Sequence, residues 1–444
     1  MNICVINGSP KGNYSITLQT ILYLEKLFPN HHFEVLHVGQ QIRAFEKDFS
    51  KAEEVIKNSD LLLFSYPVYT FIAPSQLHRF IKLLKDAKLD LNNKFATQIT
   101  TSKHFYDVTA HRYVEDNCYD MGIKYIKGLS ADMDDLLTAK GQQDAKKFME
   151  YVEWCMNNDY HEIAPITYEK TVPVLADTCE DSVKRDGDVV IITDATEDDI
   201  SLNKMIERFQ KRLPIKSRIV NLNDVRMDGG CLGCFNCAVD GKCIYKDAFD
   251  DYLRNQIQTA DSIIYAYTIK DHSMGALFKT YDDRNFCNGH RTVTMGMPLG
   301  YLVSGNVSKE FNLQMIMEAR SEVGSNFLAG VASDEINPNR EIDQLVERLV
   351  YALEHKYVQP SNFYGVGGMK IFRDLIYLMQ GMMKADHKFY KAHNQYDFPQ
   401  KHRGRLIMMY LVGFMLATPS IKAKLGNKMN EGMLAPYKKL FKEM

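Results

Sequence analysis

The sequence predicts an α/β protein with two tandem domains, each a parallel five-stranded sheet with helices on both faces, followed by a helical C-terminal extension. Three observations lead to this fold class. Apolar strand patterns alternate with helical patterns across short links, which is typical of βαβ units joined by right-handed crossovers. The alternation stops in a polar stretch and then restarts in a similar order. At 444 residues, the chain is also too long for one ordinary core.

The first alternating series covers residues 1–160. Its clearest strand is a continuous apolar run, DLLLFSYPVY, which is typical of a strand buried between two helical layers. A helix is expected from about Ser15 to Leu27, and another over residues 74–87. The expected strands are NICVIN (2–7), HFEVLHV (32–38), DLLLFSYPVY (60–69), KFATQITTS (94–102) and IKYIKGL (123–129).

Residues 161–187 are expected to link the two domains, because they are polar, mixed in charge and interrupted by Pro165 and Pro173. The second series then covers residues 188–356. The two halves share their layout more than their sequence, which indicates a tandem duplication of one α/β domain. The expected strands are DVVIITDA (188–195), SRIVNL (217–222), DSIIYAYT (261–268), LGYLVSG (299–305) and NFLAGVA (326–332).

Charge and cysteine content narrow the class of protein. The formal net charge of -2 gives no reason to expect a nucleic-acid partner. The N-terminal stretch MNICVINGSP enters a strand at once and has no signal-peptide pattern, so a cytoplasmic location is expected. In a reducing compartment, nine cysteines point to metal ligation rather than to disulfides.

The stretch INGSPKGNYSITL places polar groups where the first strand passes into a helix. Ser9, Lys11, Ser15 and Thr17 offer hydroxyls and a positive charge at a helix N-terminus, whose N–H groups favour a phosphate monoester. The loop lacks the ending of a Walker A motif and the GxGxxG of dinucleotide-binding folds. An ordinary capped turn is the alternative interpretation.

Two further loops are expected at the same edge of the sheet. YPVYTFIAPSQLHRFI puts a proline and an aromatic residue just past the third strand, and TTSKHFYD puts small hydroxyl residues just past the fourth. Ligands of open α/β sheets bind at the carboxyl ends of the strands. One phosphate-binding loop beside two flat, aromatic loops predicts a site for a planar phosphorylated cofactor.

Over about residues 1–155, these motifs resemble those of the NAD(P)H-dependent FMN reductases of flavodoxin-like fold. That family carries a G-S-P-[KR] phosphate motif and a P-x-Y motif beside the isoalloxazine ring. The resemblance implies FMN as cofactor and NAD(P)H as electron donor. The FMN-binding residues that it implies are Ser9, Lys11, Ser15, Ile16 and Thr17 at the phosphate, and Pro67, Val68, Tyr69, Thr70, Thr100, Thr101 and Ser102 at the ring.

The second half carries CLGCFNCAVDGKC, with four of the nine cysteines in thirteen positions. Structural zinc sites usually combine two ligand pairs that lie a dozen or more residues apart. Four thiolates this close favour an iron–sulfur cubane, as in compact ferredoxin-type runs. Zinc and reduced, unmetallated thiols remain the alternatives.

Residues 188–335 resemble the iron–sulfur flavoproteins, which are flavodoxin-like proteins with such a cysteine run before the second helix. The resemblance implies a [4Fe-4S] cluster that exchanges electrons with FMN across a subunit contact. The ligands that it implies are Cys231, Cys234, Cys237 and Cys243.

Each half lacks what the other contains. Where the first half has NGSPKGNYSIT, the second has TDATEDDISLN, with acidic residues at 194, 197, 198 and 199 and no lysine. Each such charge close to a phosphate dianion costs on the order of 1–4 kcal/mol at surface-like dielectric constants. The second half is therefore predicted to have lost an FMN phosphate site, and the first half has no cysteine run. Flavin and cluster would then meet inside one chain.

Residues 357–444 form the predicted extension, which is basic and rich in methionine. From residue 361 onward there are fourteen Lys or Arg against five Asp or Glu, so charge balance favours packing against the acidic remainder. A lid over the flavin site is a second interpretation, and peripheral contact with an anionic membrane surface is a weaker third. The apolar run LIMMYLVGFMLA is too short for a span, which needs about 20 residues.

The predicted protein is an FMN-dependent NAD(P)H oxidoreductase that transfers electrons between FMN in domain 1, a [4Fe-4S] cluster in domain 2 and an external acceptor. The acceptor would be a small or quinone-like molecule, or a ferredoxin-like protein. No catalytic proton-transfer residue is required, because the flavin carries the chemistry. The alternatives are a quinone, nitro or azo reductase with a structural cysteine loop, and a non-enzymatic electron carrier or redox sensor. A homodimer is allowed, with Cys287, His290 and Arg291 at a subunit contact or in a solvated loop.

Overall fold

The computed structural model describes residues 1–164, 172–396, 403–416 and 420. Residues Met1–Phe389 form one compact unit and Tyr390–Met444 a second, and the two are described separately. The predicted linker is described except for its residues 165–171. Of the predicted extension, residues 397–402, 417–419 and 421–444 lie outside the described residues.

The N-terminal domain is a parallel sheet in the order β2-β1-β3-β4-β5, with β6 also paired to β4. The single strand expected over residues 123–129 is divided in two, because the chain turns past Gln98 at Gly128, where a Cβ atom would overlap the Gln98 carbonyl. The sheet therefore has six strands instead of five. The strands are β1 Asn2–Asn7, β2 His32–Leu36, β3 Leu61–Pro67, β4 Phe95–Ser102, β5 Lys124–Tyr125 and β6 Leu129–Asp132.

Alternating residues of each strand bury two separate core layers. On β1, Ile3 and Val5 pack with α1 and α6, whereas Cys4 and Ile6 pack with α2 to α5 on the other face. Ser15 caps α1 by accepting a hydrogen bond from the Leu18 N–H, so the helix begins where the sequence predicts. The helices are α1 Ile16–Leu27, α2 Val38–Lys47, α3 Ser50–Asn58, α4 Ser75–Asp86, α5 Asp107–Asp120 and α6 Ala139–Asn157.

The second domain repeats this architecture, with the parallel strand order β8-β7-β9-β10-β11. Helices α7 and α12 cover one face of the sheet, and α9 to α11 cover the other. The predicted fold class, two parallel α/β sheets and a helical C-terminal region, is confirmed. The elements are β7 Arg185–Thr193, α7 Ile200–Arg212, β8 Ile215–Asn221, α8 Asn236–Asp240, α9 Phe249–Tyr252, β9 Ser262–Thr268, α10 Ala276–Arg284, β10 Pro298–Ser304, α11 Phe311–Val323, β11 Phe327–Ser333 and α12 Pro338–His355.

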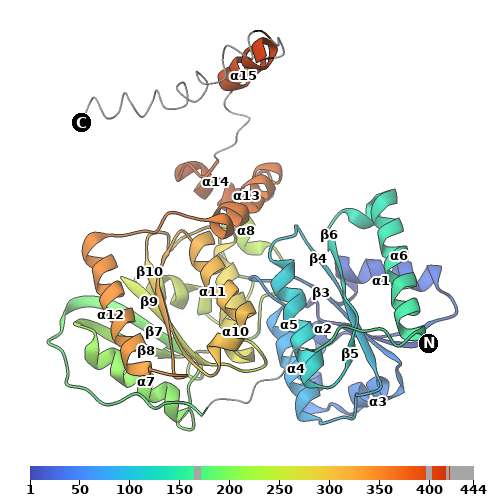
Figure 1. The fold of residues 1–444 in the computed structure, drawn as a ribbon, viewed down its shortest axis with the longest axis horizontal. Helices are drawn as coiled ribbons and strands as arrows, with labels where there is room; N and C mark the ends of the chain where they lie inside the picture. The colour runs from blue at the N-terminus through green and yellow to red at the C-terminus, as the bar shows by residue number, and fades with distance from the viewer. Residues whose placement is uncertain (165–171, 397–402, 417–419, 421–444) are drawn as a thin grey trace. The chain divides into compact units, whose positions relative to one another are not determined.

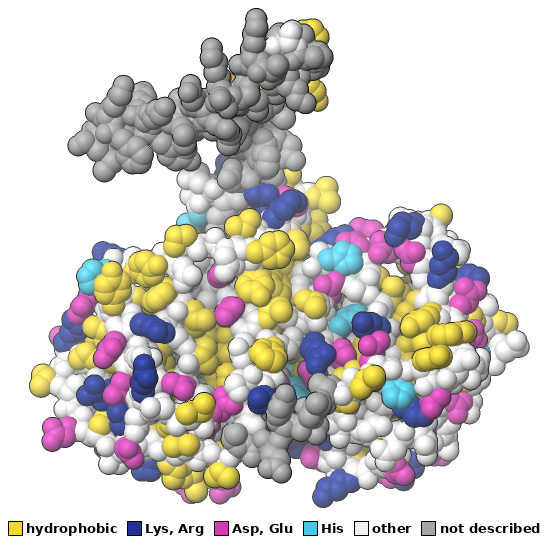
Figure 2. Space-filling model, in the orientation of Figure 1, with side chains coloured by type: hydrophobic (Ala, Val, Ile, Leu, Met, Phe, Trp, Pro, Cys, Tyr) yellow, Lys and Arg dark blue, Asp and Glu magenta, His cyan; other side chains and the backbone are white. Residues whose placement is uncertain are grey.

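Helices dominate the described part of the C-terminal region: α13 Phe363–Leu378, α14 Lys384–Ala392 and α15 Arg403–Leu416. Helix α13 belongs to the first compact unit. Many of its exposed side chains are apolar, with Phe363 85% exposed and Leu378 83% exposed, although the ion pair of Lys370 and Asp374 is exposed as well; Figure 2 shows apolar side chains gathered there. Among the described helices, none is both long and apolar enough to cross a bilayer.

The two sheets meet through corresponding helices. Helix α4 packs against α10, and α5 packs against α11, and in Figure 1 these four helices lie between the two sheets. Helices α4 and α10 each follow the third strand of their own domain, so corresponding elements of the two halves meet at this contact, as they do in an isologous dimer. The chain thus contains its own dimer-like interface.

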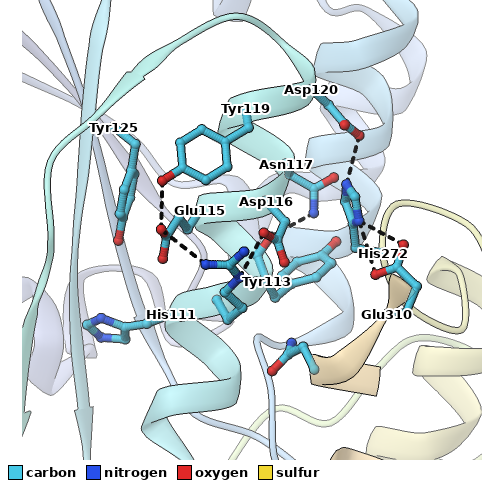
Figure 3. Close-up of polar contacts among 12 residues, drawn as sticks. His111, Tyr113, Glu115, Asp116, Asn117, Tyr119, Asp120, Tyr125, His272 and Glu310 are labelled. Atoms are coloured by element: carbon cyan, nitrogen blue, oxygen red, sulfur yellow. Dashed lines mark hydrogen bonds and ion pairs between the residues drawn. The ribbon is translucent and has the colours of Figure 1, made fainter. Parts of the chain in front are cut away.

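His272 forms two ion pairs at this interface. As Figure 3 shows, its ring lies between Asp120 of α5 and Glu310 at the start of α11. The ring nitrogens lie 3.0 Å from each carboxylate. Burial opposes the charged ring, but these two carboxylates outweigh it and raise the pKa of His272 to about 10.

A His272→Asn variant tests this ion pair across pH. Asn tolerates the left-handed backbone of this position (φ 60°) but carries no charge. Because the folded-state pKa is raised, the contribution is complete below about pH 6.5 and is lost as pH rises toward 10. We expect urea unfolding to show that the free energy of unfolding of the variant is about 1–3 kcal/mol below that of the wild type near pH 7, and that this difference becomes smaller by pH 10. A difference in free energy of unfolding that does not change with pH would contradict the role of His272 as a charged partner of the two carboxylates.

Candidate functional site

The loop after β1 is fixed by its own polar groups. The Asn7 side chain donates to the Gly12 carbonyl at 3.1 Å and accepts from the Ser9 N–H at 3.2 Å. The Ser9 hydroxyl accepts from the Lys11 N–H at 3.3 Å. Ser9 and Ser15 are almost fully buried, whereas Lys11 is partly exposed. The hydroxyls and the ammonium group are therefore placed at the N-terminus of α1, where an anion is favoured.

All three predicted loops of domain 1 meet in one cavity at the carboxyl edge of its sheet. Thr17 and Thr101 join two of them through their hydroxyls, which lie 2.5 Å apart. Eleven of the twelve residues predicted to bind FMN line this cavity: Ser9, Lys11, Ser15, Ile16, Thr17, Pro67, Val68, Tyr69, Thr70, Thr101 and Ser102.

Thr100 is the member of the predicted set that does not line the cavity. Successive side chains of a strand point to opposite faces, so Thr100 and Thr101 cannot both face the same side of β4. Thr100 instead points toward α5, where its hydroxyl lies 2.7 Å from the His111 ring. Burial lowers the pKa of His111 to about 4, so this ring is neutral at pH 7.

The second domain and α13 form the opposite wall of the cavity. From the cysteine loop come Cys231, Gly233, Phe235, Cys237 and Ala238. The segment after α10 adds Phe286, Gly289 and His290, and α13 adds Ile371, Phe372 and Leu375. The sequence patterns did not identify these last six residues as part of the site, because they carry no local motif. His290 was instead expected in a subunit contact or a solvated loop.

The cysteine loop packs closely on the FMN-motif loops of domain 1. Lys11 Nζ lies 5.3 Å from the centre of the Phe235 ring, a cation–π contact between the two domains. Gln76 Nε2 donates to the Cys231 carbonyl at 3.4 Å. At Gly233 the backbone lies so near Tyr69 that a Cβ atom would overlap the tyrosine hydroxyl.

The four cysteines of the loop are free thiols that interact electrostatically with one another. Burial raises the pKa of Cys231, and burial followed by the Asp386 carboxylate raises the pKa of Cys237 to about 11. Cys237 Sγ donates to the Phe286 carbonyl at 2.8 Å. Among the described residues, no group of three or more Cys, His, Asp or Glu side chains is arranged to hold a metal ion. The predicted metal ligands therefore remain a prediction.

The matching edge of the second domain is filled by its own carboxylates. Asp199, before α7, accepts from the Thr196 N–H at 2.9 Å and from the Thr268 hydroxyl at 3.0 Å. Asp334 accepts from Ser304 at 2.5 Å and from Ser201 at 2.6 Å. Thr196 and Ser201 belong to the loop that corresponds to residues 8–17 of domain 1, so these carboxylates accept hydrogen bonds from donors of that loop.

Helix α13 connects both domains above the cavity. Phe372 stacks on Phe105 of domain 1, with ring centres 4.4 Å apart, and contacts the His290 ring of domain 2 at 4.8 Å. Behind His290, the fully buried Asp386 accepts from the histidine ring at 3.2 Å. The N-terminal part of the predicted extension thus forms part of the candidate site.

Comparisons with known proteins show which families and folds this chain is similar to. Residues 1–117 match the model of the NADPH-dependent FMN reductase family. The chain is 26% identical over 176 residues to an iron–sulfur flavoprotein of Archaeoglobus fulgidus, an alignment that covers 36% of this chain and 77% of the relative. It is 33% identical over 84 residues to an iron–sulfur flavoprotein of Clostridioides difficile. That alignment covers 19% of this chain and 36% of the relative. Among solved structures, an FMN-dependent NADH-azoreductase of Bacillus anthracis aligns with this chain at a TM-score of 0.27 and 16% sequence identity. The alignment covers 35% of this chain and 98% of the azoreductase chain.

The family match confirms the predicted resemblance and the predicted enzyme class, an FMN-dependent NAD(P)H oxidoreductase. The match lies in the domain that contains the phosphate loop. The cluster named in the two iron–sulfur relatives is a property of those proteins.

Substitution of Gly233 tests the contact between the cysteine loop and Tyr69. We expect Gly233→Ala to force Tyr69 or the loop out of place and to lower the free energy of unfolding by about 1–3 kcal/mol more than Gly241→Ala. Both glycines have a left-handed backbone (φ 61° and 82°), so Gly241→Ala controls for backbone strain. Denaturant unfolding measures the difference, and equal losses would show that the Tyr69 contact is unimportant.

Proposed function

We propose that the chain is an NAD(P)H-dependent flavin oxidoreductase in which FMN bound by domain 1 exchanges electrons with a [4Fe-4S] cluster bound by the cysteine loop of domain 2. One observation carries the proposal: the FMN-motif residues of domain 1 and two cysteines of domain 2 line the same cavity. The cysteines are over two hundred residues away from the phosphate loop in the chain, so only the fold brings them together.

The residues around the cavity suit FMN. Lys11, Ser9 and Ser15 would bind the 5′-phosphate at the N-terminus of α1, because they combine a positive charge with hydroxyl groups. Pro67 and Tyr69 would contact the ring, and the Tyr69 ring meets Phe286 edge-on at 6.1 Å. Bound FMN would supply two-electron chemistry with the nicotinamide and one-electron chemistry with a cluster.

The cysteine loop suits a cluster better than a single ion. Four thiols lie within thirteen residues, which is the short spacing of compact ferredoxin-type runs. In a cubane the thiolates bind separate irons and are therefore spread apart. The raised thiol pKa values mean that assembly of the cluster must release protons. The names of the two iron–sulfur relatives support the same cofactor.

The cavity wall opposite the FMN motifs favours a flat, apolar acceptor. Phe286 of domain 2, with Phe372 and Leu375 of α13, makes this wall mainly hydrophobic. A quinone-like molecule fits such a surface, and a ferredoxin-like protein could instead exchange electrons through the exposed Cys234 side of the loop. We place the protein in a reducing, cytoplasmic compartment.

A quinone, nitro or azo reductase with a structural cysteine loop is the second candidate. The apolar cavity favours it, since reduction of such acceptors needs only the flavin. This candidate and the cluster proposal differ in metal content, which makes the two separable.

Cofactor content of anaerobically purified protein tests the proposal. We expect about one FMN, four iron and four sulfide per chain, with absorbance near 400 nm that dithionite bleaches. We expect Cys234→Ser to lose iron and sulfide and to keep FMN, because Cys234 does not line the cavity. Full FMN with no iron would favour the second candidate, and two FMN per chain would refute the divided site.

Charge removal at the phosphate loop tests which half binds FMN. Lys11→Gln should weaken FMN binding about tenfold or more, since a charge-assisted hydrogen bond contributes about 1.5–3 kcal/mol. Glu197→Gln, in the corresponding loop of domain 2, is the matched control and should leave FMN affinity within twofold. Flavin fluorescence titration measures both. Equal effects of the two substitutions would contradict the assignment to domain 1.

A further inference from the structure

The P-x-Y loop of domain 1 contains a strained turn. Tyr69 and Ile72 exchange backbone hydrogen bonds of 2.8 and 3.1 Å around Thr70 and Phe71. Both central residues have a left-handed backbone, with φ 43° and 71°. A two-residue turn of this kind favours Asn-Gly, whereas a β-branched residue such as Thr is rarely found in it. Something outside the turn must therefore stabilise it.

The corresponding turn of domain 2 is better suited to its conformation. Lys270 and Ser273 close it with the same pair of hydrogen bonds, but its central residues are Asp271 and His272. Asp and His occur in the left-handed region more often than Thr or Phe. The greater strain is therefore on the side that has the FMN motifs.

Two side chains of domain 2 hold the strained turn. Lys279 of α10 donates to the Tyr69 carbonyl at 3.1 Å and to the Thr70 hydroxyl at 2.5 Å. Asp283, one helical turn later, accepts from the Thr70 hydroxyl and from the Ser75 N–H, each at 2.7 Å. The turn is thus bonded to α10 through its backbone and through its side chain.

These two groups are also bonded to each other. Lys279 and Asp283 are fully buried and form an ion pair, and Asp282 pairs with both Lys279 and Arg320 of α11. Burial lowers the pKa of Lys279 to about 8, against the attraction of Asp283. A buried charge that lost its partner would be strongly unfavourable, so the pair is confined to this geometry.

We propose that Lys279 and Asp283 are positioning residues for the flavin ring, and that the FMN site of domain 1 is complete only when α10 of domain 2 is docked on it. This inference rests on the proposed function. Tyr69 and Thr70 line the cavity, so their placement sets the surface on which the ring would lie. The second domain then serves flavin binding through α10 as well as through the cysteine loop.

The test uses the full-length chain with both charges removed, Lys279→Met together with Asp283→Asn, so that no buried charge is left alone. We expect FMN affinity, measured by flavin fluorescence, to fall at least tenfold. Adding Thr70→Gly, which relieves the left-handed strain, should recover most of the loss. If the ion pair had only a structural role, Thr70→Gly would not restore FMN affinity.

The matched control is another ion pair between the two domains, Lys85 of α4 with Asp271 of the domain 2 turn, whose charged groups lie 3.1 Å apart. Lys85→Met with Asp271→Asn should leave FMN affinity within twofold. If the first double variant does not fold, Thr70→Val, which removes only the hydroxyl, should still weaken FMN binding severalfold. This inference alone would be overturned if the folded Lys279→Met, Asp283→Asn variant bound FMN within twofold of the wild type. It would also be overturned if the control variant lost as much FMN affinity as that variant. Absence of FMN binding by the wild-type chain would overturn the proposed function and this inference together.

Discussion

The packing of α4 on α10 determines where every other part of the site lies. This contact places a buried network, Lys279 with Asp282 and Asp283, against the FMN-motif loop of the other domain. Removal of one partner from such a pair typically costs about 3–5 kcal/mol, whereas an apolar replacement of the whole pair can be neutral. We therefore expect the network to contribute more to the choice of one arrangement of the two domains than to stability. Since the cysteine loop belongs to domain 2, that arrangement also sets its distance from the phosphate loop.

The two halves are symmetric in architecture and asymmetric in chemistry. Strand order and interface helices correspond, yet one sheet edge offers Ser9, Ser15 and Lys11 while the other is filled by Asp199 and Asp334. A symmetric dimer would carry two equivalent sites. In the part of the chain that the structure describes, one cavity has the Ser9 and Ser15 hydroxyls and the Lys11 ammonium group on one wall and the thiols of Cys231 and Cys237 on the other. Helix α13 then lines the cavity with apolar side chains that have no counterpart in the duplicated domains.

Local patterns predicted most of the fold and one wall of the site. The strand Asn2–Asn7 and the Ser15 cap follow from hydrophobic alternation and capping chemistry, which act over a few residues. Thr100 does not line the cavity, because a loop motif does not show which of two neighbouring strand residues faces it. Phe286, His290 and Phe372 could not be predicted, since their place depends on how the domains pack and carries no sequence motif. The division of the last strand at Gly128 likewise depends on a close approach to Gln98.

A crystal structure of anaerobically purified protein, with anomalous diffraction measured at the iron and zinc edges, tests the central claim most directly. The account predicts one FMN per chain with its phosphate beside Lys11, and an iron signal at the loop of Cys231 to Cys243 facing the same cavity. An FMN at the edge beside Asp199, a zinc signal at the cysteines, or an iron site remote from the flavin would contradict a single redox centre divided between the two halves.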